Sequence, residues 1–450
     1  MKKIFHYALL FAAAGVMSLG FSSCSDNESE DKTVEVQATE LETIVAQYVN
    51  DVVNPTYRDL QSAAARLDEA CKNLYTKRVA GTLTQTDIDA ACTAFKQARK
   101  YWEQSEAFLY GAASNDEIDP HIDSWPLDQT QLANALTDPE VIEGITGENA
   151  ASFVYLQNDN FGSTMGFHGL EFVLFRKGDN RTLAAFNAEY EDGEGLNSKG
   201  ENVEQNKAKL KTVKTVQEAA FAAAVAGDLH NMTTLLAYEW TADAALKNYL
   251  TQNAKWTLMA SRFDGLTSAG VSYGEAVKTV GLTTSLFVSW PVNLNNIFDG
   301  GCSNICQEVY TQKLGQAYRV AIGKPEQGEE GEDAADYIES PYSKNSFQDY
   351  QDNIYSIKNS LYGMRGTETV STPSTNSIMA FMKKNYPEYN ALNNALNNAI
   401  SALENAKNSR IAFIDDPGND QVGTCKDAVE ALNKQLKLAA TWCSKNIIVK

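Results

Sequence analysis

The chain is poor in histidine and proline and contains few runs that alternate in polarity like a β-strand. Four histidines and ten prolines occur in its 450 residues. From Glu40 onward, apolar residues recur at three- and four-residue steps, which is the pattern of amphipathic helices. The sequence therefore predicts an all-α fold with few strands. Because imidazole is so scarce, any metal site here must depend mainly on carboxylates.

Three motifs that would identify a catalytic or cofactor site are missing. The sequence has no His-Glu-x-x-His helix of zinc peptidases, no Gly-x-Ser-x-Gly nucleophile turn and no Cys-x-x-Cys-His haem attachment. Beyond the N-terminal region, no stretch is apolar enough to span a bilayer. The formal net charge of −20 argues against nucleic acid or an anionic membrane as an electrostatic partner, and it is compatible with attracting cations.

The N-terminus has the pattern of a lipoprotein signal. Lys2 and Lys3 precede an apolar run that is too short to cross a membrane, and small residues then lead to Cys24. We predict that residues 1–23 are a signal peptide and that Cys24 becomes the lipid-modified first residue. The product would be an outer-membrane lipoprotein that faces the periplasm or the cell surface. The alternative is an ordinary cleaved signal followed by an incidental cysteine.

The segment after the signal is polar and acidic. We expect residues 24–38 to be a solvated tether. The acidic run resembles the surface-export signal of some Bacteroidetes lipoproteins, and a plain spacer is the alternative. Six further cysteines follow, at positions 71, 92, 302, 306, 425 and 443. Export permits them to pair, but their number leaves the pairing open and a chain of this length does not require disulfides.

A glycine- and acid-rich break suggests how the chain is divided. Residues 192–200 interrupt the helical pattern, so we predict a first helical bundle over residues 39–195 and a second over residues 201–450. The tripeptide Ser-Trp-Pro at residues 124–126 recurs at residues 289–291. This repeat hints at a duplication, although three residues are weak support for one.

A histidine and a glutamate lie three residues apart in an apolar segment. His168 and Glu171 would share one face of a helix. A buried carboxylate is costly without a partner, so the two side chains could grip one cation, as in the metal sites of helix bundles. The alternative is a His–Glu hydrogen bond that joins two helices. Because His-x-x-Glu is common by chance, the flanking residues must decide.

Those flanking residues resemble the imelysin family. Residues 166–175, Gly-Phe-His-Gly-Leu-Glu-Phe-Val-Leu-Phe, are similar to its Gly-x-His-x-x-Glu signature. Residues 106–111 resemble its Glu-Ala-Phe-x-x-Gly helix end, and residues 125–128 its Trp-Pro-Leu-Asp segment. Residues 339–363 are similar to a serine-rich segment of its second half. The resemblance covers most of the mature chain and implies two packed helix-bundle halves with a site in the cleft between them.

The resemblance also implies the site residues. His168 and Glu171 would bind a metal ion, and Glu106, at the position of a family glutamate, would be a third oxygen ligand. Further candidates for lining the cleft are Asp123, Asp128, Ser343 and Asp349. Lys344 stands where relatives often carry His or Asp, so an anion rather than a metal is the partner we expect for it. Glu103 matches the family poorly, and we predict a solvated helix residue there.

Three functions are consistent with these residues. The first is a lipid-anchored envelope protein that binds a divalent or trivalent metal ion for iron uptake, with iron as the first choice and zinc as the second. Related domains occur in periplasmic components of iron-uptake systems, which implies an iron-containing ligand and an envelope transport partner. The second is a zinc-type metallopeptidase, for which the sequence supplies no assigned general base. The third is a surface interaction protein in which the His168–Glu171 pair is structural.

Overall fold

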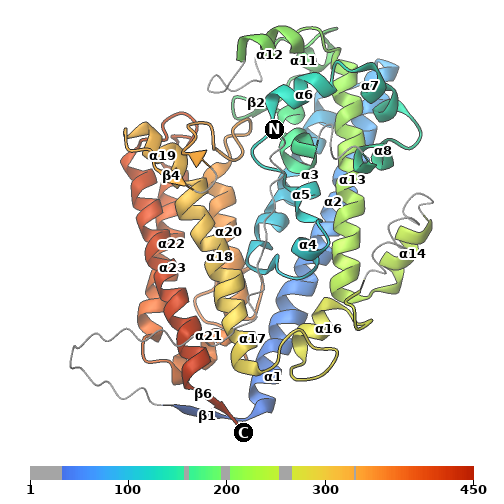
Figure 1. The fold of residues 1–450 in the computed structure, drawn as a ribbon. Helices are drawn as coiled ribbons and strands as arrows, with labels where there is room; N and C mark the ends of the chain where they lie inside the picture. Colours follow the sequence, from blue (N-terminus) through green and yellow to red (C-terminus); the bar gives the residue numbers. More distant parts are fainter. Residues whose placement is uncertain (1–32, 157–161, 194–202, 253–265, 329–330) are drawn as a thin grey trace.

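Helices make up nearly all of the regular structure, and they form two groups that lie side by side (Figure 1). The computed structural model describes residues 33–156, 162–193, 203–252, 266–328 and 331–450. The predicted signal peptide, Cys24 and most of the predicted tether lie outside these residues. The predicted all-α class with two packed bundle halves is confirmed. No helix in the described parts of the chain combines the length and the apolar character needed to cross a membrane.

The first group is built around three long helices. An uninterrupted helical run comprises α1 (Ala38–Gln47), a π-helical segment η1 (Tyr48–Val53) and α2 (Asn54–Ala80). Pro55 stands at the start of α2, directly after η1, and the helical run continues through it. α3 (Gln85–Glu103) begins at a capping box, in which Thr84 and Asp87 bond each other's backbone amides.

The third long helix of this group is α13 (Thr215–Thr241), which packs along α2. Almost every residue of α13 is buried, so the helix has no solvent-facing stripe and serves as the core of the first group. α13 follows the predicted division at residues 192–200, so residues on both sides of that position contribute to one packed group. The domain bounds themselves stay a prediction.

The second group contains a helical run, broken by two π-helical segments, and three further helices. The run comprises α17 (Trp290–Asn296), η4 (Ile297–Ser303), α18 (Asn304–Glu308), η5 (Val309–Lys313) and α19 (Gly315–Ala321). The helices packed with it are α20 (Ser346–Tyr362), α22 (Tyr389–Asn408) and α23 (Asp420–Asn446). α20 also packs against α3, and this contact joins the two groups (Figure 1).

Short elements fill the edges of both groups. The helical ones are η2 (Glu106–Phe108), α4 (Ala112–Asn115), α5 (Asp119–Ile122), α6 (Gln129–Ala135), α7 (Pro139–Thr146), α8 (Ala150–Leu156), η3 (Gly162–Thr164), α10 (Gly166–Leu174), α11 (Leu183–Asn187), α12 (Val203–Leu210), α14 (Ala244–Gln252), α16 (Tyr273–Lys278), η6 (Thr367–Thr369) and α21 (Ile378–Asn385). The strands are β1 (Val34–Val36), β2 (Phe175–Arg176), β3 (Asp179–Asn180), β4 (Gln327–Gly328), β5 (Gly331–Glu332) and β6 (Ile447–Val449). β1 pairs in parallel with β6, so the two ends of the described chain meet.

Two details of the sequence reading look different in the structure. The two Ser-Trp-Pro tripeptides have different settings, because residues 124–126 lie in the loop between α5 and α6 whereas residues 289–291 begin α17. The tripeptide therefore gives no support to a duplication. The six cysteines that follow Cys24 are all buried and free, so no disulfide links the described helices.

Candidate metal centre

Two glycines place the predicted His-x-x-Glu segment against the backbone of its neighbours. At Gly166, φ is +66°, and a Cβ there would overlap the carbonyl oxygen of Ile122. A Cβ at Gly169 would overlap the carbonyl oxygen of Thr164. Only glycine permits this approach, which brings α10 directly onto the end of α5. The motif thus determines which residues His168 can reach.

His168 pairs with an aspartate of the residue 118–128 segment. Its Nε2 lies 2.7 Å from Oδ1 of Asp123, and the imidazole is 1% exposed. The Trp125 ring packs on the imidazole at a centroid distance of 4.4 Å, and Trp102 Nε1 donates to Oδ2 of Asp123 at 2.8 Å. Both carboxylate oxygens of Asp123 are therefore held in place by neighbouring side chains.

A buried arginine lies behind this pair. Arg99 contacts Asp123, Glu103 at 2.6 Å, Glu339 at 2.5 Å and Asp349 at 3.6 Å. Burial opposes the charge on the guanidinium, but these four carboxylates raise its pKa well above the ordinary value. Burial likewise opposes ionisation of Asp123, but Arg99 and then His168 outweigh it and hold the pKa of that carboxyl well below its usual range. We call these five residues the Arg99 cluster.

Glu171 does not face the same point as His168. Its Oε1 accepts hydrogen bonds from the backbone N–H of Ser343 at 2.7 Å and from the Ser343 hydroxyl at 2.6 Å. Burial raises the pKa of Glu171 to about 7, and the two bonds from Ser343 limit the rise. The i, i+3 pair therefore connects α10 to two different partners, one in the first half of the chain and one in the second.

Three side chains bring potential metal ligands together. One ligand atom each of Asp123, His168 and Glu339 lie within 4.8 Å of one another. Two carboxylates and one imidazole form a donor set that suits iron, manganese or zinc. The Oε2 atom of Glu339 and the Nε2 atom of His168 are buried, and charged groups lie beside them: Lys313 Nζ is 3.2 Å from that Oε2, and Asp123 Oδ1 is 2.7 Å from that Nε2. These observations fit a cation at this point, where Arg99 and Lys313 supply the positive charge in the structure.

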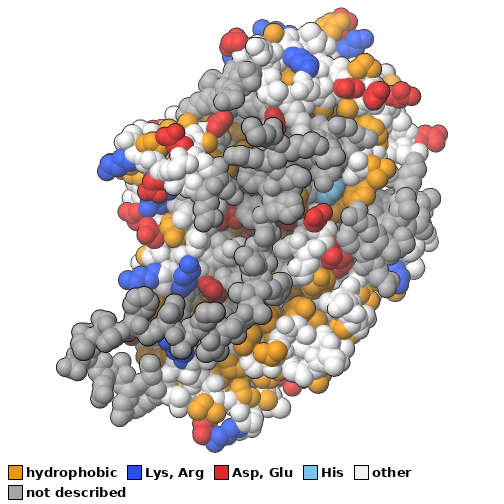
Figure 2. Space-filling view, in the orientation of Figure 1, with side chains coloured by type: hydrophobic (Ala, Val, Ile, Leu, Met, Phe, Trp, Pro, Cys, Tyr) orange, Lys and Arg blue, Asp and Glu red, His pale blue; other side chains and the backbone are white. Residues whose placement is uncertain are grey.

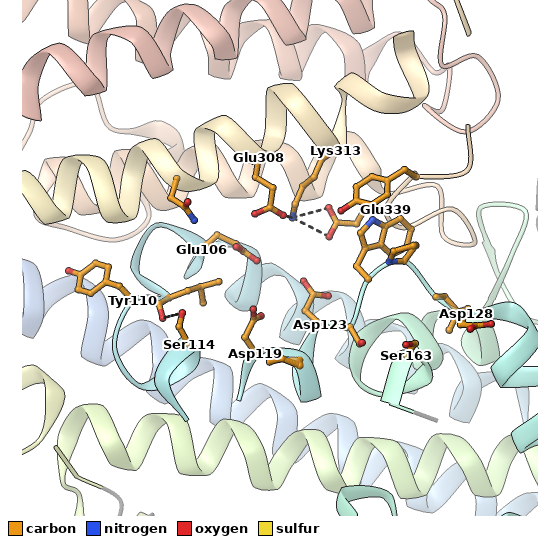
Figure 3. A pocket seen from close by; sticks show the side chains of 18 of the residues that line it. Glu106, Tyr110, Ser114, Asp119, Asp123, Asp128, Ser163, Glu308, Lys313 and Glu339 are labelled. Carbon is orange, nitrogen blue, oxygen red and sulfur yellow. Dashed lines mark hydrogen bonds and ion pairs between the residues drawn. The ribbon is translucent and has the colours of Figure 1, made fainter. Parts of the chain in front are cut away.

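A pocket of about 410 Å³ opens beside this group, between the two halves of the molecule. Glu106, Asp119 and Asp123 enter it from the first half of the chain, and Glu308, Lys313 and Glu339 from the second (Figure 3). Trp125 and Tyr337 form part of its wall. The predicted cleft between the halves is thus present, and six carboxylates line it: Glu106, Asp119, Asp123, Asp128, Glu308 and Glu339.

The six carboxylates that line the pocket outnumber the cationic side chains beside them. Burial raises the pKa of Glu106, of Glu308 and, to about 8, of Asp119. The ammonium of Lys313 lies 3.2 Å from Glu339 and 3.7 Å from Glu308, and these and other carboxylates raise its pKa although burial opposes its charge. The pocket therefore holds oxygens that would gain from additional positive charge.

Comparison with known protein families identifies the family of this chain. A model of the imelysin family matches residues 53–439. The chain belongs to the imelysin family. Iron-regulated protein A of Synechococcus elongatus is 30% identical over 168 residues, which are 37% of this chain and 38% of that protein. The match thus spans less than half of that relative. A crystal structure of an iron-regulated protein A precursor from Parabacteroides distasonis shares the fold, with a TM-score of 0.67 and 22% identity over 91% of this chain and 96% of that one.

The structure places the site residues predicted from the imelysin resemblance in three different settings. Asp123 and His168 meet in the ligand group, whereas Glu171 is turned to Ser343. Glu106 lines the pocket from η2 but lies outside the ligand group. Their metal-binding roles stay predictions. Three further candidates have other contacts: Asp128 caps α6 at the pocket edge, Asp349 accepts from Ser340 and Asn345 beneath the pocket, and Ser343 bonds Glu171.

Two expectations about charged residues can be judged directly. The prediction of a solvated Glu103 is wrong, because this side chain is fully buried and pairs with Arg99 one helical turn away. The expected anion partner of Lys344 is a carboxylate of the chain itself, since its Nζ contacts both oxygens of Asp415 at 2.8 and 2.9 Å.

Sequence reasoning did not name five charged residues of this imelysin site. They are Arg99, Asp119, Glu308, Lys313 and Glu339. Arg99 and Glu103 are spaced i, i+4 on a helix whose buried face includes Phe95 and Trp102, and that spacing could have indicated a buried ion pair. Lys313 and Glu308 lie on a stretch with no recognised motif, so their role depended on the tertiary structure.

Proposed function

We propose that this imelysin-family protein binds a metal ion in the pocket between its halves and serves iron uptake at the cell envelope. The convergence of Asp123, His168 and Glu339 at the base of an acidic pocket carries the proposal. The metal, when bound, would supply a compact positive charge to carboxylates that Lys313 and Arg99 only partly neutralise. Iron is our first choice and zinc our second.

The choice of iron rests on two supports. The donor set of one imidazole and several carboxylates suits a hard or borderline cation. A relative with 30% identity over part of its length, and a protein with the same fold, are both named iron-regulated protein A. The acidic pocket would also disfavour negatively charged chelates, so a free or positively charged form of the metal is the ligand that the site suits.

Metal analysis of the purified mature protein tests the proposal. After equilibration with ferrous, manganous and zinc ions and removal of excess metal, we expect about one ion per chain in the wild type. Asp123→Asn combined with His168→Ala should lose it. His230→Gln is the matched control, because His230 is a buried histidine that pairs with Asp68 at 3.1 Å away from the pocket. Equal metal content in the folded double variant and the wild type would overturn the proposed site.

A metallopeptidase is the second candidate, and one observation favours it. The sequence offered no general base, but the structure places Asp119 in the pocket with a pKa near 8. A carboxylate that titrates near neutral pH can exchange a proton with a metal-bound water. This candidate predicts cleavage of a peptide library that a chelator abolishes and that Asp119→Asn slows at least about a hundredfold. Stoichiometric metal without cleavage would favour the binding role.

We also propose that Cys24 anchors the protein to the outer membrane. The support is the signal pattern at residues 1–24 and the acidic segment after it. Mass spectrometry of the protein purified from cell membranes should find a diacylated or triacylated N-terminal peptide that begins at Cys24. An unmodified peptide that begins at another residue would contradict the anchor. Proteolysis of intact cells would then show whether the protein faces the periplasm or the surface.

A further inference from the structure

One end of the molecule exposes a group of apolar side chains. Leu282 and Val288 are 61% and 80% exposed, and they lie in the segment between α16 and α17. The group, which we call the apolar end patch, consists of Leu282, Leu286, Val288, Val292, Ile448 and Val449. These are six of the twelve large hydrophobic side chains that are exposed among the described residues. Such concentration indicates a surface that contacts an apolar partner.

The patch is displayed by an ordered turn. The backbone N–H of Gly281 donates to the carbonyl oxygen of Phe287 at 2.9 Å, and the Ser285 hydroxyl donates to the Thr279 carbonyl at 2.6 Å. Phe287 is buried at 7% exposure, and its two neighbours, Leu286 and Val288, point outward. The buried Phe287 side chain therefore holds the turn in place, while the apolar side chains on either side of it stay in water. Their exposure is unfavourable in free energy, and an apolar partner would remove that penalty.

This end is also the end where the described chain begins. β6, which carries Ile448 and Val449, pairs with β1, and α1 packs against both α16 and α17 (Figure 1). Hydrophobic side chains gather at the corresponding end in the space-filling view (Figure 2). The turn of residues 279–289, strand β6 and the start of α1 therefore form one end of the molecule.

The tether brings this end close to any membrane that holds Cys24. Val34 lies ten positions after Cys24, and ten residues can span at most about 36 Å. The helical run from Ala38 to Ala80, by comparison, is about 65 Å long at 1.5 Å per residue. The end that carries β1 is thus the one that an anchored chain presents to the bilayer.

Charge at this end permits that approach. Although the whole chain is strongly acidic, three carboxylates at this end have lysine partners. Glu275 pairs with Lys278 at 3.0 Å, Lys384 pairs with Glu40 at 3.2 Å, and Lys450 pairs with Glu35. Paired carboxylates repel an anionic lipid surface far less than free ones.

We propose that the apolar end patch inserts into the bilayer that carries the Cys24 anchor, and so fixes the orientation of the protein on the membrane. The occupant of the patch is a lipid surface, in the way that interfacial segments lie at the boundary of headgroups and acyl chains. The proposal rests on the proposed anchor and is independent of the metal. The long axis of the helices would then stand away from the membrane, with the pocket above the lipid surface.

The test attaches the mature chain, residues 24–450, to phospholipid vesicles through a maleimide lipid at Cys24. The other six cysteines are buried, so coupling is selective. Val288→Trp and Val79→Trp are compared in vesicles with brominated acyl chains, which quench tryptophan on contact. Val79 is the matched control, because it is an exposed valine, at 62%, near the far end of α2. We expect quenching of the added tryptophan at position 288 and none at position 79.

A second measurement uses charge. Leu282→Glu combined with Val288→Glu should weaken the adsorption of the uncoupled chain to vesicles by about tenfold or more. Equal quenching at positions 79 and 288, or none at either in a folded coupled chain, would overturn the proposal. A concentration-dependent dimer of the uncoupled chain that the double variant abolishes would assign the patch to a second copy instead. Acylation in the cell and metal content are measured separately, so the failure of either is distinguishable from failure here.

Discussion

The Arg99 cluster and the acids of the pocket differ in how their charges are compensated, although they share Asp123 and Glu339. In the Arg99 cluster, Glu103 also accepts from Asn353, and Asp349 accepts from Ser340 and Asn345. In the pocket, none of the hydrogen bonds among the described residues reaches the side-chain carboxylate of Glu106 or Asp119, and Lys313 lies 3.7 Å from Glu308. Glu103 and Asp349, which belong to the Arg99 cluster alone, therefore have donors on several sides. The pocket carboxylates have room for a cation.

This difference separates structural charge from functional charge. A buried carboxylate that has donors on several sides contributes to folding, and removing its partner is costly. A carboxylate that faces an open pocket without donors makes the folded state less stable until a ligand arrives. The pKa values show what a close cation changes: Arg99 and His168 hold the pKa of Asp123 low, whereas burial raises the pKa of Glu103, that of Asp349 to about 7 and that of Asp119 to about 8.

The largest effect should come from Arg99→Met. This change leaves Asp123, Glu103 and two further carboxylates buried beside each other without their shared guanidinium. We expect a loss of about 3–5 kcal/mol in the free energy of unfolding. Urea unfolding followed by circular dichroism measures it. Arg365→Met is the control, since the pair of Arg365 with Asp59 is partly exposed and should be worth about 1 kcal/mol or less. Equal losses of unfolding free energy in the two variants would contradict a structural role for the Arg99 cluster.

An effect of opposite sign, which depends on pH, should come from Asp119→Asn. The folded-state pKa near 8 means that the folded protein keeps a proton that the unfolded chain releases above about pH 4. Asp119 thus costs nothing below pH 4, and its cost grows as the pH rises toward 8. The variant should be more stable than the wild type by up to about 5 kcal/mol at pH 8 and equal to it near pH 4.

Thermal unfolding across this pH range, with a chelator present, checks the prediction. The exposed Asp179→Asn is the control and should change little at any pH. A destabilised Asp119→Asn at pH 8 would place Asp119 with the compensated carboxylates of the Arg99 cluster.

The smallest effect should come from Lys344→Met. The ammonium of Lys344 is held by Asp415, which is itself half exposed. We expect a loss of at most about 1 kcal/mol in stability and no change in metal content. Metal analysis beside thermal unfolding would check both. A variant that loses its metal would extend the functional region to this surface.

The sequence was a good guide where the reason for a residue is local. The all-α class follows from periodicity, and the two glycines of the Gly-x-His-Gly segment have local causes, a positive φ at Gly166 and close backbone approaches at both. His168 and Asp123 were both named from the motifs, and they meet. These residues could be predicted because each lies within a short segment whose pattern is specific.

Contacts between distant segments could not be predicted in the same way. Arg99 and Glu339 are separated by 240 positions, and their pairing depends on how the halves pack. The i, i+3 spacing of His168 and Glu171 correctly places both side chains in the buried wall, but not their partners, because Ser343 reaches Glu171 from the second half. Glu103 was misjudged for the same reason, since its environment is created by α20.

The parallel pairing of β1 and β6 has a practical consequence for engineering. The backbone N–H of Lys450 donates to the carbonyl oxygen of Val36 at 2.9 Å, so both ends of the described chain emerge at one pole. An affinity tag or reporter fused after Lys450 would sit beside Val34, where the membrane that we propose for the Cys24 anchor would hide it from antibodies or proteases. An insertion at the turn after α2, around Gly81, would place the same reporter at the opposite pole.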